Sequence, residues 1–156
     1  MCQRSFIDTE YDIVSVTISL DSKYALAVVF RSDKLSIVRI YSLNSEDMSN
    51  KYESQHEIRG YYVKARSIVQ NDSGNLFACP YYDHGFFYVM IFNLKETIQQ
   101  LNVSEILGLD GRCKPLLGFS DPMINATFLS GSCIFINVFH NKDLNHFHFI
   151  YDYTKK

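Results

Sequence analysis

The chain has 156 residues, of which 47% are hydrophobic and 21% are charged, and its 15 basic and 17 acidic residues leave a formal net charge of -2. This composition is typical of a chain that buries one hydrophobic core, and the charge balance offers no positive surface for a nucleic acid or an anionic membrane. No apolar run approaches the roughly 18 residues that a membrane span needs, and residues 1–10 contain no apolar signal segment. We therefore expect a single domain over residues 1–156, located in the cytoplasm, that binds neither nucleic acid nor membrane.

The cysteines lie far apart in the chain, at Cys2, Cys79, Cys113 and Cys133, and no two of them form a Cys-x-x-Cys pair. This spacing indicates neither a zinc knuckle nor a redox dithiol. We expect reduced side chains that pack as small hydrophobes, and the sequence predicts no cofactor.

Aromatic residues are abundant, with 11 Tyr, 12 Phe and no Trp, and they alternate with Val and Ile in short runs broken by Asp, Asn, Ser and Gly. Such runs are typical of β-strands. In chain order the first unit predicts strands over residues 14–19, 24–30 and 35–43. The two turns between them are short enough for antiparallel hairpins.

The same three-strand pattern occurs three times. Residues 14–43 match 65–94 and 124–153 without gaps, at offsets of 51 and 110, so that Leu26 corresponds to Phe77 and Ile136. The end of each unit is the clearest marker, because IYSL at 40–43 returns as IFNL at 91–94 and as IYDY at 150–153. A duplicated unit of about 30 residues is the pattern of a repeat fold. Between units, Tyr52 to Gly60 predicts a fourth, edge strand, whereas residues 95–122 fit no single period.

The unit resembles a blade of a WD-repeat β-propeller. The resemblance lies in SLDSKYALA at 19–27 and IVRIYSL at 37–43, which are similar to the family's S-x-D-x-K-Y-L-A turn and V-x-I-W-D-L strand, and it recurs in NDSGNLFA at 71–78 and VMIFNL at 89–94. The chain departs from the family in lacking a Trp-Asp dipeptide and a Gly-His before the first strand. The resemblance covers nearly the whole chain and implies an all-β, partial β-propeller of three antiparallel blades with three to four strands each.

Three blades leave both ends of the ring open, because closed propellers have roughly four to eight. Either a longer protein or a partner would then complete the ring. The alternative is a β-trefoil, which closes with three four-stranded repeats. A trefoil would need a more regular fourth strand, and the step of 59 residues between the second and third units (110 minus 51) leaves a long insertion.

In WD-repeat proteins the turns between the second and third strands of the blades form a common partner-binding face. The second of these turns is flanked by aromatic residues, and alternation places Tyr81 and Phe87 toward the core and Tyr82 and Phe86 toward a partner. The resemblance implies that a protein partner contacts Arg31, Asp33, Lys34, Tyr82, Asp83, His84, Phe86, Lys142 and Asp143.

Three histidines near the C-terminus form the only metal-like group in the sequence. A hairpin with its turn at 141–145 would set His140 opposite His146, and His148 would lie two residues further on the same face. A zinc site needs its ligands to converge on one ion. We expect surface histidines and no metal, with this group as a weak alternative.

We find no nucleophile elbow, phosphate loop, His-Glu-x-x-His helix or close carboxylate pair in the sequence. We therefore expect a non-catalytic module that binds another protein, or itself, through the turn face or an open sheet edge. The alternatives are a β-trefoil module that binds a carbohydrate or another small ligand, and a fragment of a larger protein.

Overall fold

The computed structural model describes residues 12–31, 35–43, 52–59, 68–83, 86–109, 123–129, 132–140 and 145–155. The elements in this part of the chain are β1 (Asp12–Ile18), β2 (Tyr24–Arg31), β3 (Leu35–Ser42), β4 (Ser54–Arg59), β5 (Val69–Gln70), β6 (Phe77–Asp83), β7 (Phe86–Phe92), β8 (Thr97–Asn102), α1 (Val103–Ile106), β9 (Met123–Phe128), β10 (Cys133–His140) and β11 (Asn145–Asp152). Within these residues no helix is long and apolar enough to cross a membrane.

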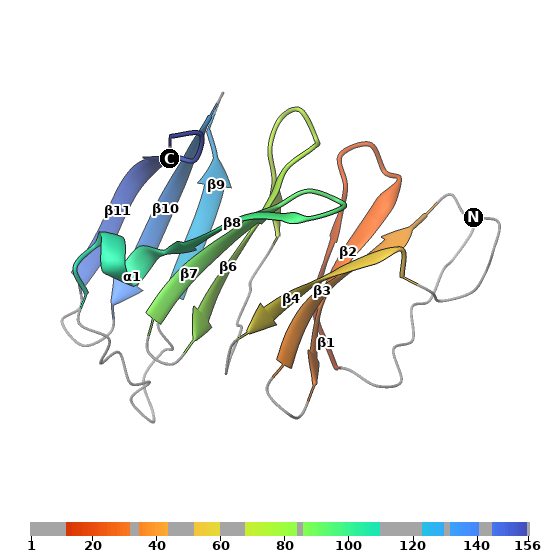
Figure 1. Ribbon diagram of the computed structural model, residues 1–156, viewed down its shortest axis with the longest axis horizontal. Coiled ribbons are helices and arrows are strands. Elements are labelled where there is room, and N and C mark those ends of the chain that lie inside the picture. The colour runs from red at the N-terminus through yellow and green to blue at the C-terminus, as the bar shows by residue number, and fades with distance from the viewer. Residues whose placement is uncertain are drawn as a thin grey trace.

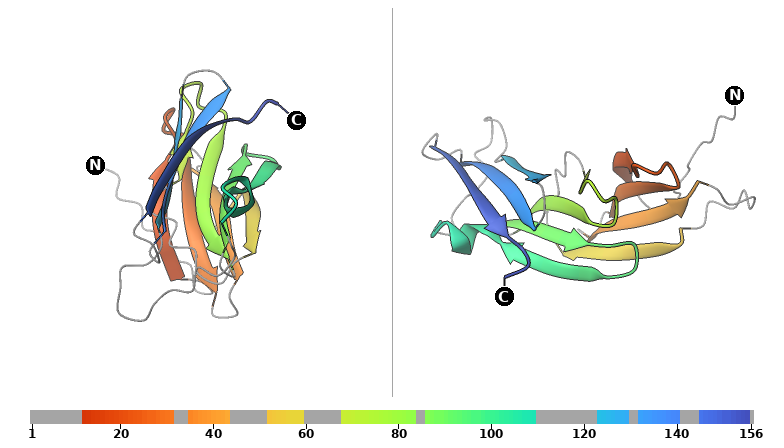
Figure 2. Two further views of the ribbon diagram at one scale, coloured as in Figure 1. Left: turned by 90° about the vertical axis from the view of Figure 1, so that its left-hand side faces the viewer. Right: turned by 90° about the horizontal axis from the view of Figure 1, so that it is seen from above.

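The strands form three antiparallel sheets, which we call the first, second and third sheets. Their strand orders are β1-β2-β3-β4, β5-β6-β7-β8 and β11-β10-β9. Within each sheet, strands that are consecutive in the sequence are therefore paired. Figure 1 shows the three sheets side by side in chain order, and the left view of Figure 2 looks along this row with β11 in front. The expected all-β class and the partial propeller of three blades are confirmed. The β-trefoil alternative is wrong, since the strands form separate sheets.

The second sheet holds the row together because both of its faces are apolar. One face carries Phe77, Met90 and Phe92, which pack against Leu26 and Ile40 of the first sheet. The opposite face packs against the third sheet. This second interface contains Ala78, Val89, Ile91, Ile124, Ala126, Ile134, Ile136 and Val138. Burying each large apolar side chain in these interfaces contributes about 1.5–3 kcal/mol to the stability of the stacked sheets.

Two of the sheets have a fourth strand. The predicted strand within Tyr52–Gly60 is confirmed as β4, in which His56 and Ile58 are buried while Gln55 and Glu57 are exposed. The second connector provides β8, which the sequence does not predict clearly. Its pattern is irregular because the register shifts between Ile91 and Phe92 of the partner strand, and because β8 runs directly into α1.

The hairpins between the second and third strands of the units differ in length. The residues between the paired ends are 32–34 in the first sheet, 84–85 in the second and 141–144 in the third. A change of one residue turns a strand's side chains to the opposite face. Leu26 therefore packs forward onto the second sheet while Phe77 packs back onto the first, and their gapless correspondence is wrong although both are buried as expected.

The turns before β2 and β6 follow one hydrogen-bond pattern, at an offset of 52. Ser19 N donates to Tyr24 O and Asn71 N to Leu76 O, and each turn ends with an amide bonded to the side chain of its first residue, Tyr24 N to Ser19 Oγ and Leu76 N to Asn71 Oδ1. Each also contains one residue with positive φ, Ser22 at 57° and Gly74 at 73°. The repeated turn is therefore one residue out of step with the sequence match.

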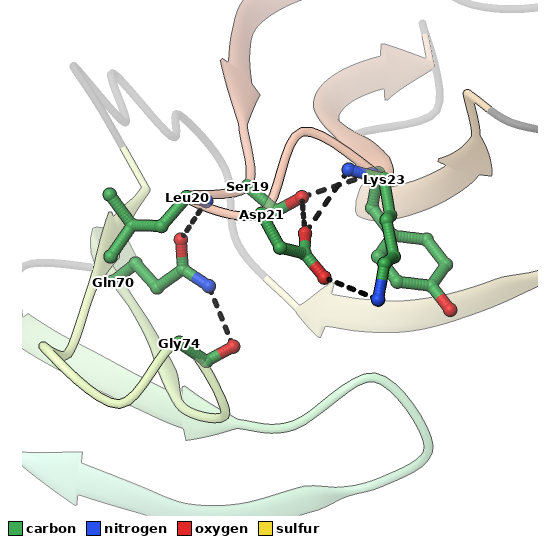
Figure 3. A network of polar contacts seen from close by, with 7 residues as sticks. Ser19, Leu20, Asp21, Lys23, Gln70 and Gly74 are labelled. Carbon is green, nitrogen blue, oxygen red and sulfur yellow. Dashed lines mark hydrogen bonds and ion pairs between the residues drawn. The ribbon is translucent and has the colours of Figure 1, made fainter.

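Gln70 links these two turns across the first interface. Leu20 N donates to Gln70 Oε1 at 2.7 Å, and Gln70 Nε2 donates to Gly74 O, also at 2.7 Å, as Figure 3 shows. In the first turn, Asp21 Oδ1 accepts from Ser19 Oγ and from Lys23 N, and these bonds lower the pKa of the Asp21 carboxyl. One side chain thus fixes the spacing of adjacent sheets at their turn ends.

Candidate protein-binding surfaces

The predicted turn face lies at the carboxyl ends of β2, β6 and β10, and the ends of β6 and β10 point the same way in Figure 1. Arg31 is the last residue of β2 and Tyr82 the last but one of β6, and Asp83 and Phe86 are the paired residues that close the second hairpin. The other predicted contact residues lie outside the described part of the chain. These are Asp33, Lys34, His84, Lys142 and Asp143.

Near its tip the second hairpin buries Tyr81 toward the first sheet and Phe87 toward the third, and its register sets Phe86 opposite Asp83 and not opposite Tyr82. Tyr81 and Phe87 are buried, while Asp83 and Phe86 are half-buried. The Tyr81 ring stacks on Tyr88 with ring centroids 5.1 Å apart, and the Tyr81 hydroxyl accepts a hydrogen bond from Gln100 Nε2. Burial, followed by the nearby Tyr88 and Asp83, raises the pKa of Tyr81 far above its usual value. Tyr81 is therefore a neutral support beneath the turn.

The three histidines do not form the expected pair across the last hairpin. His140 pairs with Asn145, and His146 pairs with Phe139, because the turn contains four residues, 141–144, instead of five. The exposed His146 and His148 rings lie against phenylalanines, at centroid distances of 4.7 Å from Phe139 and 6.2 Å from Phe135. In the described ranges no three His, Cys, Asp or Glu side chains gather where they could hold a metal ion.

A surface that sequence reasoning did not identify lies on the third sheet, on the side away from the second. We call it the outer face. Phe147, Phe149 and Tyr151 pack toward the second sheet, so alternation directs the side chains between them to the opposite side. The described outer-face side chains are Asn125, Thr127, Cys133, Phe135, Asn137, Phe139, His146, His148, Ile150 and Asp152.

Equivalent positions of the three sheets show that this face is open to solvent at Ile150. Ile40, Ile91 and Ile150 share one place in β3, β7 and β11, at offsets of 51 and 110, and each points toward the next position in the row. Their exposed fractions are 1%, 0% and 61%. The first two isoleucines pack against the following sheet, whereas Ile150 is open to solvent. The repeat in the sequence was the available signal, since it relates Ile150 to two isoleucines that a following sheet buries.

The third sheet also has an open edge at β11. In the first sheet the same edge, on β3, pairs with β4, and Glu53 N donates to Ile40 O at 2.7 Å. No described strand pairs with β11 on this side. Tyr153 N donates to Ser132 O, so the alternation of antiparallel bonding directs the backbone groups of His146, His148 and Ile150 away from β10.

The three meander sheets define the chain as a partial β-propeller. No family model and no curated protein matches its sequence. Among solved structures it is similar to the β-propeller domain of Cps50 (Swd1) from Myceliophteria thermophila, with a TM-score of 0.47 and 11% identity, over 90% of this chain. The chain spans 40% of the length of that propeller domain.

Proposed function

We propose that this chain is a non-catalytic protein–protein interaction scaffold, a WD-repeat-like propeller segment. The observation that carries the proposal is the exposure of Ile150 at a position where its counterparts Ile40 and Ile91 are buried. Exposed apolar residues gathered on one face are typical of surfaces that bind another protein.

The outer face has the composition of a protein interface. Phe135 and Phe139 are half-buried, Ile150 is exposed, and the neighbouring Asn137, His146 and His148 are uncharged polar or titratable groups. Aromatic anchors inside a polar surround are what interfaces commonly use. The first two sheets indicate the kind of occupant, since each buries this face against another sheet. The partner is therefore a β-sheet, supplied by another protein or by a further part of a longer polypeptide.

The turn face is the second part of the proposal. Asp83 and Phe86 are half-buried at a hairpin tip on the rigid support of the buried Tyr81 and Phe87. A tip held in this way presents its side chains to a partner with little loss of conformational entropy. We keep Arg31 and Tyr82 as proposed contacts with them, and the cytoplasm as the proposed location. The unpaired Cys79 and Cys133 are compatible with that reducing compartment.

The test is site-specific photo-crosslinking in the cells that express the protein. A photoreactive amino acid at Phe139, on the outer face, should give adducts with one or a few proteins, and the substitution Ile150→Asp should abolish them. The same amino acid at Ile98 is the matched control, because Ile98 is an exposed isoleucine on the second sheet. Equal adducts at both positions, or adducts that survive Ile150→Asp, would contradict the proposal.

The size of the endogenous protein decides between the two sources of the partner sheet. An antibody raised against the chain should detect a protein of 156 residues if a separate partner covers the outer face. A much larger band would indicate that further sheets of one polypeptide cover it. In that second case the outer face is an internal packing surface, and the turn face alone remains as the proposed binding surface.

A further inference from the structure

The open edge of β11 is long and regular, and its one charged residue, Asp152, is the last of the strand. All eight of its residues, Asn145–Asp152, pair with β10 in one unbroken register, and no charged residue occurs from Asn145 to Tyr151. Natural edge strands are usually protected by charges, proline, bulges or short length. The edge strand of the first sheet has such protection, since β4 carries Glu57 and Arg59. The β11 edge has no proline or bulge, and its one charge lies at its end, so most of its length is suited to accept another strand.

The sequence of β11 is complementary to itself when two copies run antiparallel. The outward backbone groups belong to His146, His148 and Ile150, so a two-fold axis at His148 pairs His148 with its copy and His146 with the copy's Ile150. The outward backbone groups of His146, His148 and Ile150 then all find partners. No two like charges lie opposite each other in this register.

The other face of the same register brings phenylalanines together. Phe147 would pair with Phe149 of the second copy, and Phe149 with the copy's Phe147, at non-hydrogen-bonded positions where side chains lie closest. Both phenylalanines are half-buried in the single chain, and their partly exposed rings lie at the margin of the second interface. Aromatic cross-strand pairs of this kind stabilise sheets. A second copy would therefore cover apolar surface that the single chain leaves exposed.

We propose that the chain forms a symmetric dimer by antiparallel pairing of β11 with β11 of a second copy, centred on His148. The two third sheets become one sheet of six strands. The inference rests on the proposed scaffold function, because it names one surface through which the scaffold assembles. It uses the edge of the sheet, whereas the proposed partner covers the outer face.

The first experiment measures the mass of the purified chain in solution by sedimentation over a wide range of concentration. We expect a monomer–dimer equilibrium that His148→Pro weakens by about tenfold or more, because proline removes an outward N–H in each copy. His148→Thr is the matched control, since it keeps the N–H, and it should dimerise like the wild type. A mass that stays monomeric in the wild type, or an equal dimer in His148→Pro, would overturn the inference.

A second measurement tests the register and does not depend on tolerance of proline. His148→Cys places two thiols opposite each other at the two-fold axis, where the Cα separation of a bonded pair, about 5.5 Å, permits a disulfide. Mild oxidation should give a crosslinked dimer well above the wild-type background. Thr127→Cys is the control, because Thr127 is exposed on β9, two strands away from the β11 edge. Equal crosslinking of the two variants would contradict the proposed register.

Amide hydrogen exchange provides a readout from the backbone itself. The amides of His146, His148 and Ile150 should exchange rapidly in dilute protein and slowly in concentrated protein, whereas those of Phe147 and Phe149, which bond to β10, should be protected in both. Rapid exchange of the three outward amides at all concentrations would reject the dimer. Photo-crosslinking at Phe139 that persists in His148→Pro would show that the scaffold function stands without it.

Discussion

The first and third sheets are built from similar units and have different surroundings. Both begin with three antiparallel strands of similar length, and IYSL at the end of β3 corresponds to IYDY at the end of β11. The first sheet gains a fourth strand and is covered by the second sheet, so that Ile40 is buried. The third sheet has no described fourth strand, and Ile150 is exposed.

Whether a position is buried depends on where its sheet lies in the row, and not on the local sequence. An isoleucine contributes to stability only when another surface covers it, because the hydrophobic effect is proportional to the apolar area removed from water. The exposed end of the row keeps the apolar pattern of a packed sheet. It is therefore the part of the molecule most ready to bind another surface.

The largest expected effect is the difference between two equivalent isoleucines. Ile40→Ala should lower the free energy of unfolding by about 2–5 kcal/mol, because it leaves a cavity in the first interface. Ile150→Ala should change it by about 0.5 kcal/mol or less in the monomer. Urea denaturation of both variants at low protein concentration measures the two values. Equal losses would show that Ile150 is buried in solution and would remove the contrast between the sheets.

A smaller effect is expected at the turns that enter the middle strands. The equivalent first residues of these turns are Ser19, Asn71 and Leu129, so the third unit has an apolar residue where the others have a polar cap. Asn71 Oδ1 accepts from the amides of Asn75 at 3.1 Å and Leu76 at 3.0 Å. Asn71→Leu, which copies the third unit, should cost about 1–3 kcal/mol because it leaves these donors without their acceptor.

The control for this change copies the first unit instead. Asn71→Ser keeps a side-chain oxygen at the position where Ser19 Oγ accepts from Tyr24 N. It should recover at least part of the stability lost in Asn71→Leu, as measured in the same urea experiment. If the two substitutions cost the same, the side-chain cap does not stabilise the turn.

The smallest expected effect is a dependence of stability on pH, caused by His56 in the fourth strand of the first sheet. His56 of β4 is buried against Phe92, with ring centroids 4.7 Å apart. Burial lowers the pKa of His56, although a backbone group of Asn93 partly offsets this shift. The unfolded chain therefore takes up the proton more readily than the folded chain. The contribution of His56 to stability is complete above about pH 6.5 and is lost as the pH falls through the lower pKa of the folded state.

The measurement compares the wild type with His56→Phe in urea at about pH 7.5 and about pH 5. The wild type should lose more stability between these values than the variant, since phenylalanine carries no titrating group. An identical loss in both proteins would show that another group causes the pH dependence.

Much of the fold could be predicted from the sequence because strand alternation and turn residues are local properties. The bounds of β2, β3 and β4 lie within two residues of the predicted ranges, and Tyr81 and Phe87 are both buried as expected, although on opposite faces of their sheet. The pairing of His140 could not be predicted, because the sequence does not show which two residues form the last pair before the hairpin turn. For the same reason, the predicted correspondence of Leu26 to Phe77 is wrong by one residue.

The three meander sheets follow from the amino-acid sequence, since each unit carries its own alternation and its own short turns. Which faces and edges those sheets leave open depends on how they pack in three dimensions. The outer face and the β11 edge carry the same kinds of residue as their buried counterparts, Ile150 matching Ile40 and Ile91. Burial is a property of what lies beside a residue in space, and the alternation within one unit does not specify it.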